Sequence, residues 1–264
     1  MSEVVIQREE GNRQERFYSL DSLKFIFAFA IVLFHYNSSI LGNITDEYST
    51  RPLLQAIMKH GSYATEFFFM VSGFLIAHNY KSNIQHIQFK EYFKRRISAI
   101  IAPTWLCEIS IGLFLPIVMW IVKGKIDLSN IPTFYKWFQS ITFTSKGYVV
   151  SNSQWPISTV TWYVDVLIIC YVIYWCIGHQ KRKLYVPLCL IMIFLGYICL
   201  NFFDYPFLWN VNGRGYTAFF VGVLLYELQL LSHRINLQRI ATVTFIVSGL
   251  LLVISSFGGG MTKY

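Results

Sequence analysis

The chain has 264 residues, of which 55% are apolar, 18% are aromatic and 14% are charged, and this composition excludes an ordinary soluble globular protein. Its net charge of +8 does not indicate a nucleic-acid partner, because the basic residues lie at the ends of apolar runs and not along one continuous face. The five cysteines lie within apolar runs and lack the paired spacing of a metal site, so we expect no bound metal.

Residues 1–16 are polar and charged, and we expect them to form a cytoplasmic tail without a cleavable signal peptide. Residues 17–264 are expected to form one transmembrane domain, because they contain successive apolar runs long enough to cross about 30 Å of hydrocarbon. The predicted spans are residues 22–41, 62–80, 97–122, 159–178, 184–203, 214–231 and 238–258. Most basic residues fall in connections on the same side as the N-terminus, which predicts a cytoplasmic N-terminus in the plasma (inner) membrane.

A shorter aromatic and amphipathic segment covers residues 131–144. It has three interpretations: an eighth span, a re-entrant segment or an interfacial helix. The predicted fold is therefore an all-α, multi-pass transmembrane bundle of seven or eight spans.

The first predicted span carries a lysine and a histidine, Lys24 and His35, eleven residues apart. At 100° per residue this spacing places both on one helix face, separated along the axis by about 16 Å. An imidazole within the membrane is costly unless it faces protein or water. It could serve a functional site or form a hydrogen bond to a neighbouring helix, and position alone leaves both readings open.

Four sequence blocks carry a family resemblance, and they occur in the family's order. They are LDSLKFIFAFAIVLFHYN (residues 20–37), ATEFFFMVSGFLIA (64–77), FKRRISAIIAP (93–103) and NGRGYTAFFVGVLLYEL (212–228). A further block, WYVDVLIICYVIYW (162–175), fits more loosely. The chain resembles the acyltransferase-3 family, integral-membrane enzymes that move acetyl or other short acyl groups from coenzyme A to hydroxyls of sugars, glycolipids and polysaccharides. The family's first span carries a basic residue, ten intervening residues and a histidine, which Lys24 and His35 reproduce.

The resemblance implies that His35 is the general base, because a neutral imidazole can take the proton of an attacking hydroxyl near neutral pH. Glu66 could orient the imidazole or share its proton. An outer-leaflet carboxylate that faces water is the alternative for Glu66.

The donor is expected to be acetyl-coenzyme A, or another acyl-coenzyme A, as a co-substrate, with no permanently bound cofactor. Lys94, Arg95 and Arg96 precede the third span, where they could bind its phosphates or serve as topology charges beside lipid head groups. Many relatives carry a second arginine three residues after Arg96, where this chain has Ala99, so Lys24 is expected to supply part of the phosphate contact.

Candidates for acceptor binding or proton relay are Asp165, Trp162 and Arg214, and Trp155 could stack on a sugar. Arg214 is expected to pair with Asp165 or Asp204, or to reach lipid head groups. Small residues permit close helix contact in lipid, so Ser72 and Gly73 are expected to let the second span approach the first. A tunnel-lining hydroxyl is the alternative role for Ser72.

The family's domain usually has more spans than this chain shows, so its C-terminal part is expected to be incomplete. Such a chain could be inactive, or could need a second copy or a partner subunit to close its cavity. Besides an O-acyltransferase acting on a carbohydrate or glycolipid acceptor, two readings stay open. One is a glycan-lipid transporter or flippase with a proton relay through His35, Glu66 and Asp165, and the other is a catalytically silent membrane scaffold.

Overall fold

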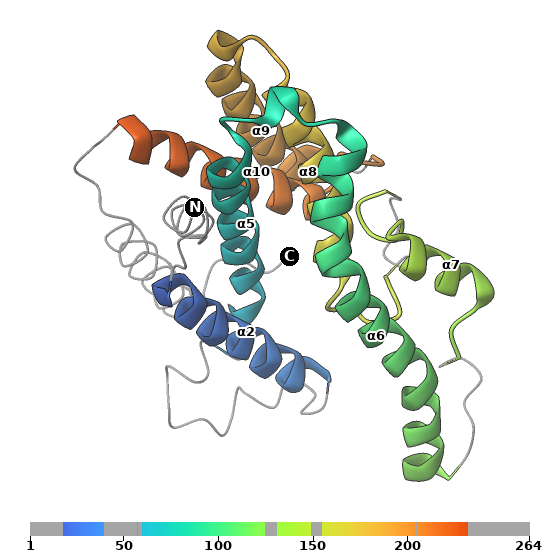
Figure 1. Cartoon of the computed structure of the whole chain (residues 1–264). Helices are drawn as coiled ribbons and strands as arrows, with labels where there is room; N and C mark the ends of the chain where they lie inside the picture. The colour runs from blue at the N-terminus through green and yellow to red at the C-terminus, as the bar shows by residue number, and fades with distance from the viewer. Residues whose placement is uncertain are drawn as a thin grey trace, which may run out of the picture. The chain divides into compact units, whose positions relative to one another are not determined.

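The computed structural model describes residues 18–39, 57, 60–124, 131–148, 155–203 and 205–231. Over these residues the chain is helical and has no strand beyond an isolated bridge between Tyr205 and Leu208 (Figure 1). The described helices are α2 (Tyr18–Ser39), α5 (Ala64–Tyr80), α6 (Phe89–Lys123), α7 (Phe134–Thr142), α8 (Trp162–Gly178), α9 (Arg182–Phe202) and α10 (Asn210–Leu231), with short 3-10 turns η1 (Gly61–Tyr63) and η2 (Ile84–His86). The predicted all-α class is confirmed.

Within the described residues, fewer helices meet the length and composition of a membrane span than the sequence predicts. Within the described residues, two segments are long and apolar enough to cross a membrane, Phe89–Val118 and Arg182–Phe202, and Trp162–Gly178 is apolar but shorter. Helices α2, α5 and α10 coincide with predicted spans but contain the charged residues Lys24, Glu66 and Arg214. The predicted span at 238–258 lies outside the described residues.

The chain forms two compact units: residues 1–64 with 233–264, and residues 65–232. In the first unit, the described helix α2 contacts η1 through Gly61. A Cβ atom at Gly61 would lie 2.5 Å from the Ala30 carbonyl oxygen and 2.9 Å from the Phe34 Cβ. Only a glycine permits so close an approach without a shift of the backbone.

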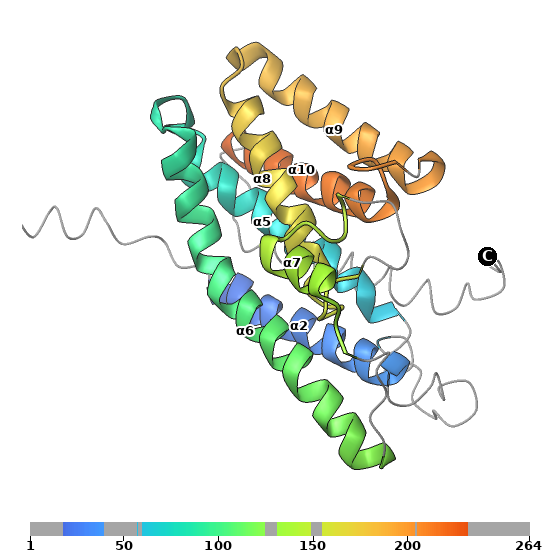
Figure 2. The same ribbon diagram turned by 90° about the vertical axis from the view of Figure 1, so that its right-hand side faces the viewer.

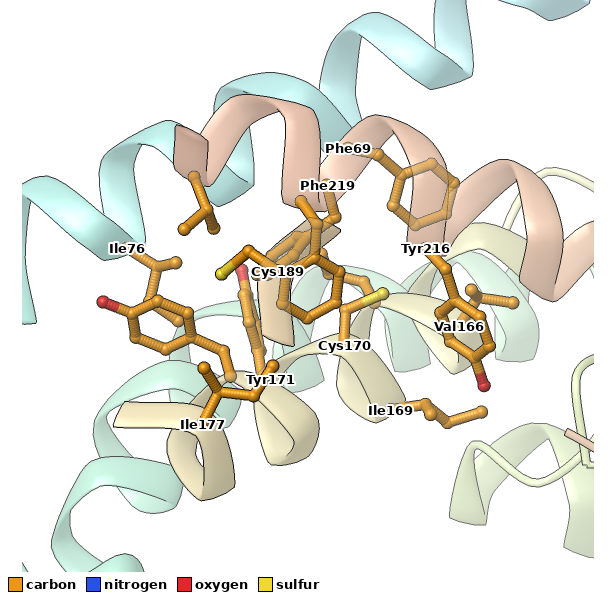
Figure 3. Packing of buried hydrophobic residues seen from close by; sticks show 14 of the residues in the cluster. Phe69, Ile76, Val166, Ile169, Cys170, Tyr171, Ile177, Cys189, Tyr216 and Phe219 are labelled. Atoms are coloured by element: carbon orange, nitrogen blue, oxygen red, sulfur yellow. The ribbon is translucent and has the colours of Figure 1, made fainter. Parts of the chain in front are cut away.

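The second unit is organised around α8, most of whose residues are buried. Its side chains meet those of α5, α9 and α10 in a single apolar cluster (Figure 3). Phe69, Cys170, Cys189 and Phe219 are all fully buried there. The cysteines are free thiols, and two of them act here as core packing residues.

Helices α5 and α10 approach each other through a reciprocal pair of glycines. A Cβ atom at Gly73 would lie 1.9 Å from the Phe219 carbonyl oxygen, and one at Gly222 would lie 1.9 Å from that of Met70. Gly73 therefore packs closely against α10. Its expected role in letting the second span approach the first stays a prediction. Ser72 lies within hydrogen-bonding reach of the Tyr171 hydroxyl on α8.

The segment at 131–144 forms only the nine-residue helix α7, which is about 14 Å long and too short to cross the hydrocarbon core. Its N-cap is Thr133, whose hydroxyl accepts a hydrogen bond from the Lys136 amide at 3.3 Å. Helix α7 lies beside α6 (Figures 1 and 2). An eighth span at this position is excluded.

Contacts at both ends of α7 show its direction relative to α6. The Trp105 indole donates a hydrogen bond to the Ile141 carbonyl at 3.0 Å, and a Cβ atom at Gly112 would lie 2.6 Å from the Trp137 ring. Later residues of α6 thus meet earlier residues of α7, so the two helices run antiparallel.

Candidate functional site

The two residues of the first-span motif, Lys24 and His35, both lie on α2. Their helical separation along the axis is about 16 Å, as the rise per residue requires. The Lys24 ammonium lies 3.2 Å from Asp21 one turn earlier. His35 is half-buried, and its ring makes an edge contact with Phe34 at a centroid distance of 5.2 Å.

A bidentate ion pair links the first turns of α5 and α10. Arg214 Nε lies 2.5 Å from Glu66 Oε1, and Arg214 Nη2 lies 2.9 Å from Glu66 Oε2. The same Nη2 donates to the Thr65 hydroxyl at 2.7 Å, and that hydroxyl donates to Glu66 at 3.0 Å. Both oxygens of the Glu66 carboxylate are therefore engaged by the guanidinium, in the planar geometry that arginine favours.

The indole of Trp162, at the start of α8, completes this cluster. The Arg214 Cζ atom lies 5.0 Å from the centroid of the Trp162 ring, within cation–π distance. A Cβ atom at Gly215 would lie 2.3 Å from Val166, so this glycine lets α10 approach α8 beside the cluster. Three of the predicted site residues, Glu66, Trp162 and Arg214, thus come together.

The partner of Arg214 differs from the sequence prediction. Asp165 is buried and accepts hydrogen bonds from the backbone amide of Ser145, at 3.1 Å, and from the Ser145 hydroxyl. Asp165 therefore anchors the segment after α7, while Glu66 holds Arg214. The alternative partner Asp204 lies outside the described residues.

A fully buried lysine follows Ser145. The Lys146 ammonium lies 4.1 Å from the ring centroid of Trp155 and 4.0 Å from that of Trp209. Desolvation lowers the pKa of Lys146 to about 8. Trp155, which could stack on a sugar, contacts this lysine through its ring.

Sequence reasoning missed a second buried carboxylate, Glu108, on α6. Its oxygens accept hydrogen bonds from the Ser158 amide at 2.9 Å and from the Thr161 hydroxyl. Cys107 adds a thiol-to-hydroxyl contact of 3.3 Å with Ser158. The available signal was an acidic residue inside an apolar run, the same signal that identified Asp165.

The three basic residues before the third predicted span lie in different environments. Lys94 and Arg95 are exposed, and Arg95 pairs with Glu91 at 2.5 Å. The Arg96 guanidinium instead stacks on Tyr80, with Cζ 4.3 Å from the ring centroid, and its buried Nε has no hydrogen-bond acceptor among the residues that the structure describes. Arg96 therefore retains a donor that an oxyanion could use.

No group of three or more His, Cys, Asp and Glu side chains within the described ranges could hold a metal ion. The chemistry that these residues offer is that of an imidazole base and of cations that bind anionic groups.

Comparison with known proteins identifies the family of this chain. A family model described as an acyltransferase domain matches residues 17–263. No significant match to this chain was found among curated proteins or solved structures. Because the match covers nearly the whole chain, including the Lys24–His35 motif and the Arg214 cluster, the chain belongs to the acyltransferase-3 family of membrane acyltransferases.

Proposed function

We propose that this protein is a membrane O-acyltransferase that moves an acyl group, most simply acetyl, from cytosolic acyl-coenzyme A to a hydroxyl. The acceptor would be a cell-surface glycan or a lipid-linked sugar. The family match over residues 17–263 carries this proposal. The occurrence of Lys24 and His35 on one continuous helix supports it further.

In the proposed reaction, His35 takes the proton of the acceptor hydroxyl as its oxygen attacks the thioester carbonyl. The tetrahedral intermediate then collapses, the carbon–sulfur bond breaks and the ester forms. Coenzyme A leaves as a thiolate, which takes from the imidazolium the proton that the acceptor hydroxyl gave up. The catalyst is regenerated with no net change in its protonation.

The distance along α2 suits the shape of the donor. An extended pantetheine arm is about 15 to 20 Å long, comparable to the helical separation of Lys24 and His35. A phosphate bound near Lys24 would therefore bring the thioester to the level of the imidazole. Arg96 is proposed separately as a phosphate ligand, supported by its buried Nε, which has no acceptor within the described part of the chain.

The arginine cluster supports a positioning role for Glu66. Both oxygens of the Glu66 carboxylate accept hydrogen bonds from the Arg214 guanidinium. We therefore assign Glu66 to holding Arg214, and Arg214 with Trp162 to contact with the acceptor.

The experiment is acetyl-coenzyme A binding and hydrolysis by the purified protein in lipid nanodiscs. We expect His35→Ala to keep binding and lose turnover by about 100-fold or more, the usual contribution of a general base. We expect Arg96→Ala to weaken binding. His86→Ala and Lys90→Ala, at exposed positions outside the proposed machinery, serve as matched controls. Absence of binding by the wild type, or turnover that survives His35→Ala, would contradict the proposal.

A further inference from the structure

Between α6 and α7 lies a cavity of about 250 Å³. Its walls come from the second half of α6, from the N-terminal end of α7 and from the segment before α8. The lining residues are Ile111, Leu115, Ile131, Pro132, Ile157, Thr133 and Lys136.

The residues that line the cavity are mostly apolar, with one charged side chain. Five of the seven residues are apolar, and the Thr133 hydroxyl already caps α7 through the Lys136 amide. The one charged side chain is that of Lys136. Polar atoms line the cavity as well as apolar ones, so the site suits an amphipathic molecule better than a purely apolar one. A hydrocarbon chain suits the apolar walls, and an anion suits the lysine.

The surface around the cavity is also apolar. Phe134 and Phe138 on α7 are 88% and 55% exposed, and Phe114 on α6 is 62% exposed. Helix α6 contains one of the two segments that could cross a membrane. Apolar surface of this extent on such a helix is typical of contact with lipid.

We infer that this cavity is a binding site for an anionic phospholipid, with part of one acyl chain against Ile111 and Leu115 and the phosphate beside Lys136. The charge of the lysine selects a lipid with net negative charge, since a zwitterionic head group offers it a weaker attraction. The site involves none of the residues proposed for acyl transfer, and lipid binding there would occur without donor or acceptor.

The test is native mass spectrometry of the purified full-length chain equilibrated with equal amounts of phosphatidylglycerol and phosphatidylcholine, without acyl-coenzyme A. We expect the wild type to retain phosphatidylglycerol preferentially. Lys136→Gln should lower this preference about five-fold, the effect of removing one lysine near an anionic lipid surface. Lys183→Gln, which neutralises an exposed lysine at the start of α9, is the matched control and should leave it unchanged.

Two substitutions at one wall residue test the acyl-chain part of the site. Ile111→Trp narrows the cavity and should reduce retention of both lipids, whereas Ile111→Ala enlarges it and should preserve retention. Soluble glycerophosphoglycerol, which has the head group without the chains, should not compete. Equal retention by wild type, Lys136→Gln and Ile111→Trp would overturn the inference, as would an equal effect of Lys183→Gln. Since Lys136 is a partly exposed side chain, the first comparison stays valid even if Ile111→Trp fails to fold.

Discussion

The ion pair between Glu66 and Arg214 joins residues 148 positions apart in the sequence through two hydrogen bonds. The two side chains retain 30% and 23% of their exposure, so water reaches the pair only partly. Removal of one partner leaves a partly desolvated charge, which costs more than the loss of an exposed pair.

We predict that Glu66→Gln and Arg214→Gln each destabilise the protein, and that the double variant is less destabilised than the sum of the two. The expected coupling energy is about 1 to 3 kcal/mol, typical of a bidentate, partly buried pair. Denaturant unfolding in mixed micelles measures it through a double-mutant cycle. Strictly additive effects would show that the two side chains do not interact in the membrane.

Lys146 gives a prediction about pH. Because burial lowers its pKa from 10.5 to about 8, the folded state binds fewer protons than the unfolded state between these two values. The free energy of unfolding should therefore rise with pH from about 8 to about 10.5. Lys146→Met removes this contribution, so the stability of the wild type relative to this variant should increase over that interval. Denaturation of both proteins at pH 7, 9 and 10 tests it, and a constant difference would contradict the lowered pKa.

Sequence reasoning succeeded at the residue scale where the geometry is local. Lys24 and His35 share one helix, so helical periodicity alone predicts their relation. The partner of Arg214 could not be predicted in this way, because the sequence suggested Asp165 or Asp204, and only the packing of α5 against α10 brings Glu66 to Arg214. Glu108 was overlooked although the rule that identified Asp165 applied equally to it.

At the scale of elements, the close approach of α5 and α10 depends on Gly73 and Gly222. A methyl group at either position would lie 1.9 Å from a carbonyl oxygen of the opposite backbone, so the helices would have to separate. We predict that Gly222→Ala lowers the free energy of unfolding by about 1 to 3 kcal/mol, the usual effect of overpacking.

The matched control is Gly124→Ala at the C-terminal end of α6. Gly124 has a positive φ of 67°, but no atom of the described residues lies within 4 Å of a Cβ built there. Its substitution should cost only about 1 kcal/mol of backbone strain. An effect of Gly222→Ala no larger than that of Gly124→Ala would show that the helices tolerate the added methyl group.

The positions of the long helices were largely predictable, because each of them corresponds to an apolar run long enough to form several helical turns. Helix α9 begins and ends within two residues of the predicted span 184–203. The nature of 131–144 was not predictable, since its aromatic pattern fits several arrangements. Only the antiparallel contact with α6, through Trp105 and Gly112, shows that it is a short helix packed on a longer one.

At the scale of the whole molecule, the orientation in the membrane remains a prediction from the distribution of basic residues. It places η2 in the cytoplasm and the segment between α9 and α10 outside. Gln85 and Tyr205 are exposed in these two segments and provide a matched pair for labelling.

We predict that Tyr205→Cys reacts with a membrane-impermeant maleimide in intact cells, in a background that carries Cys176→Ser to remove the exposed native thiol. Gln85→Cys should react only after permeabilisation. The opposite result would invert the topology and would place the basic residues Lys94, Arg95 and Arg96 on the side away from cytosolic coenzyme A.

The buried loop after α7 also has a consequence for proteolysis. Trypsin cleaves after lysine, so the Lys146–Gly147 bond is a target by sequence. In the folded protein the Lys146 side chain lies between Trp155 and Trp209, and the preceding residue is fixed to Asp165. A protease cannot take this lysine into its specificity pocket until the loop has opened. Tryptic fragments that end at Lys146 would therefore show that this loop had unfolded locally in a membrane preparation.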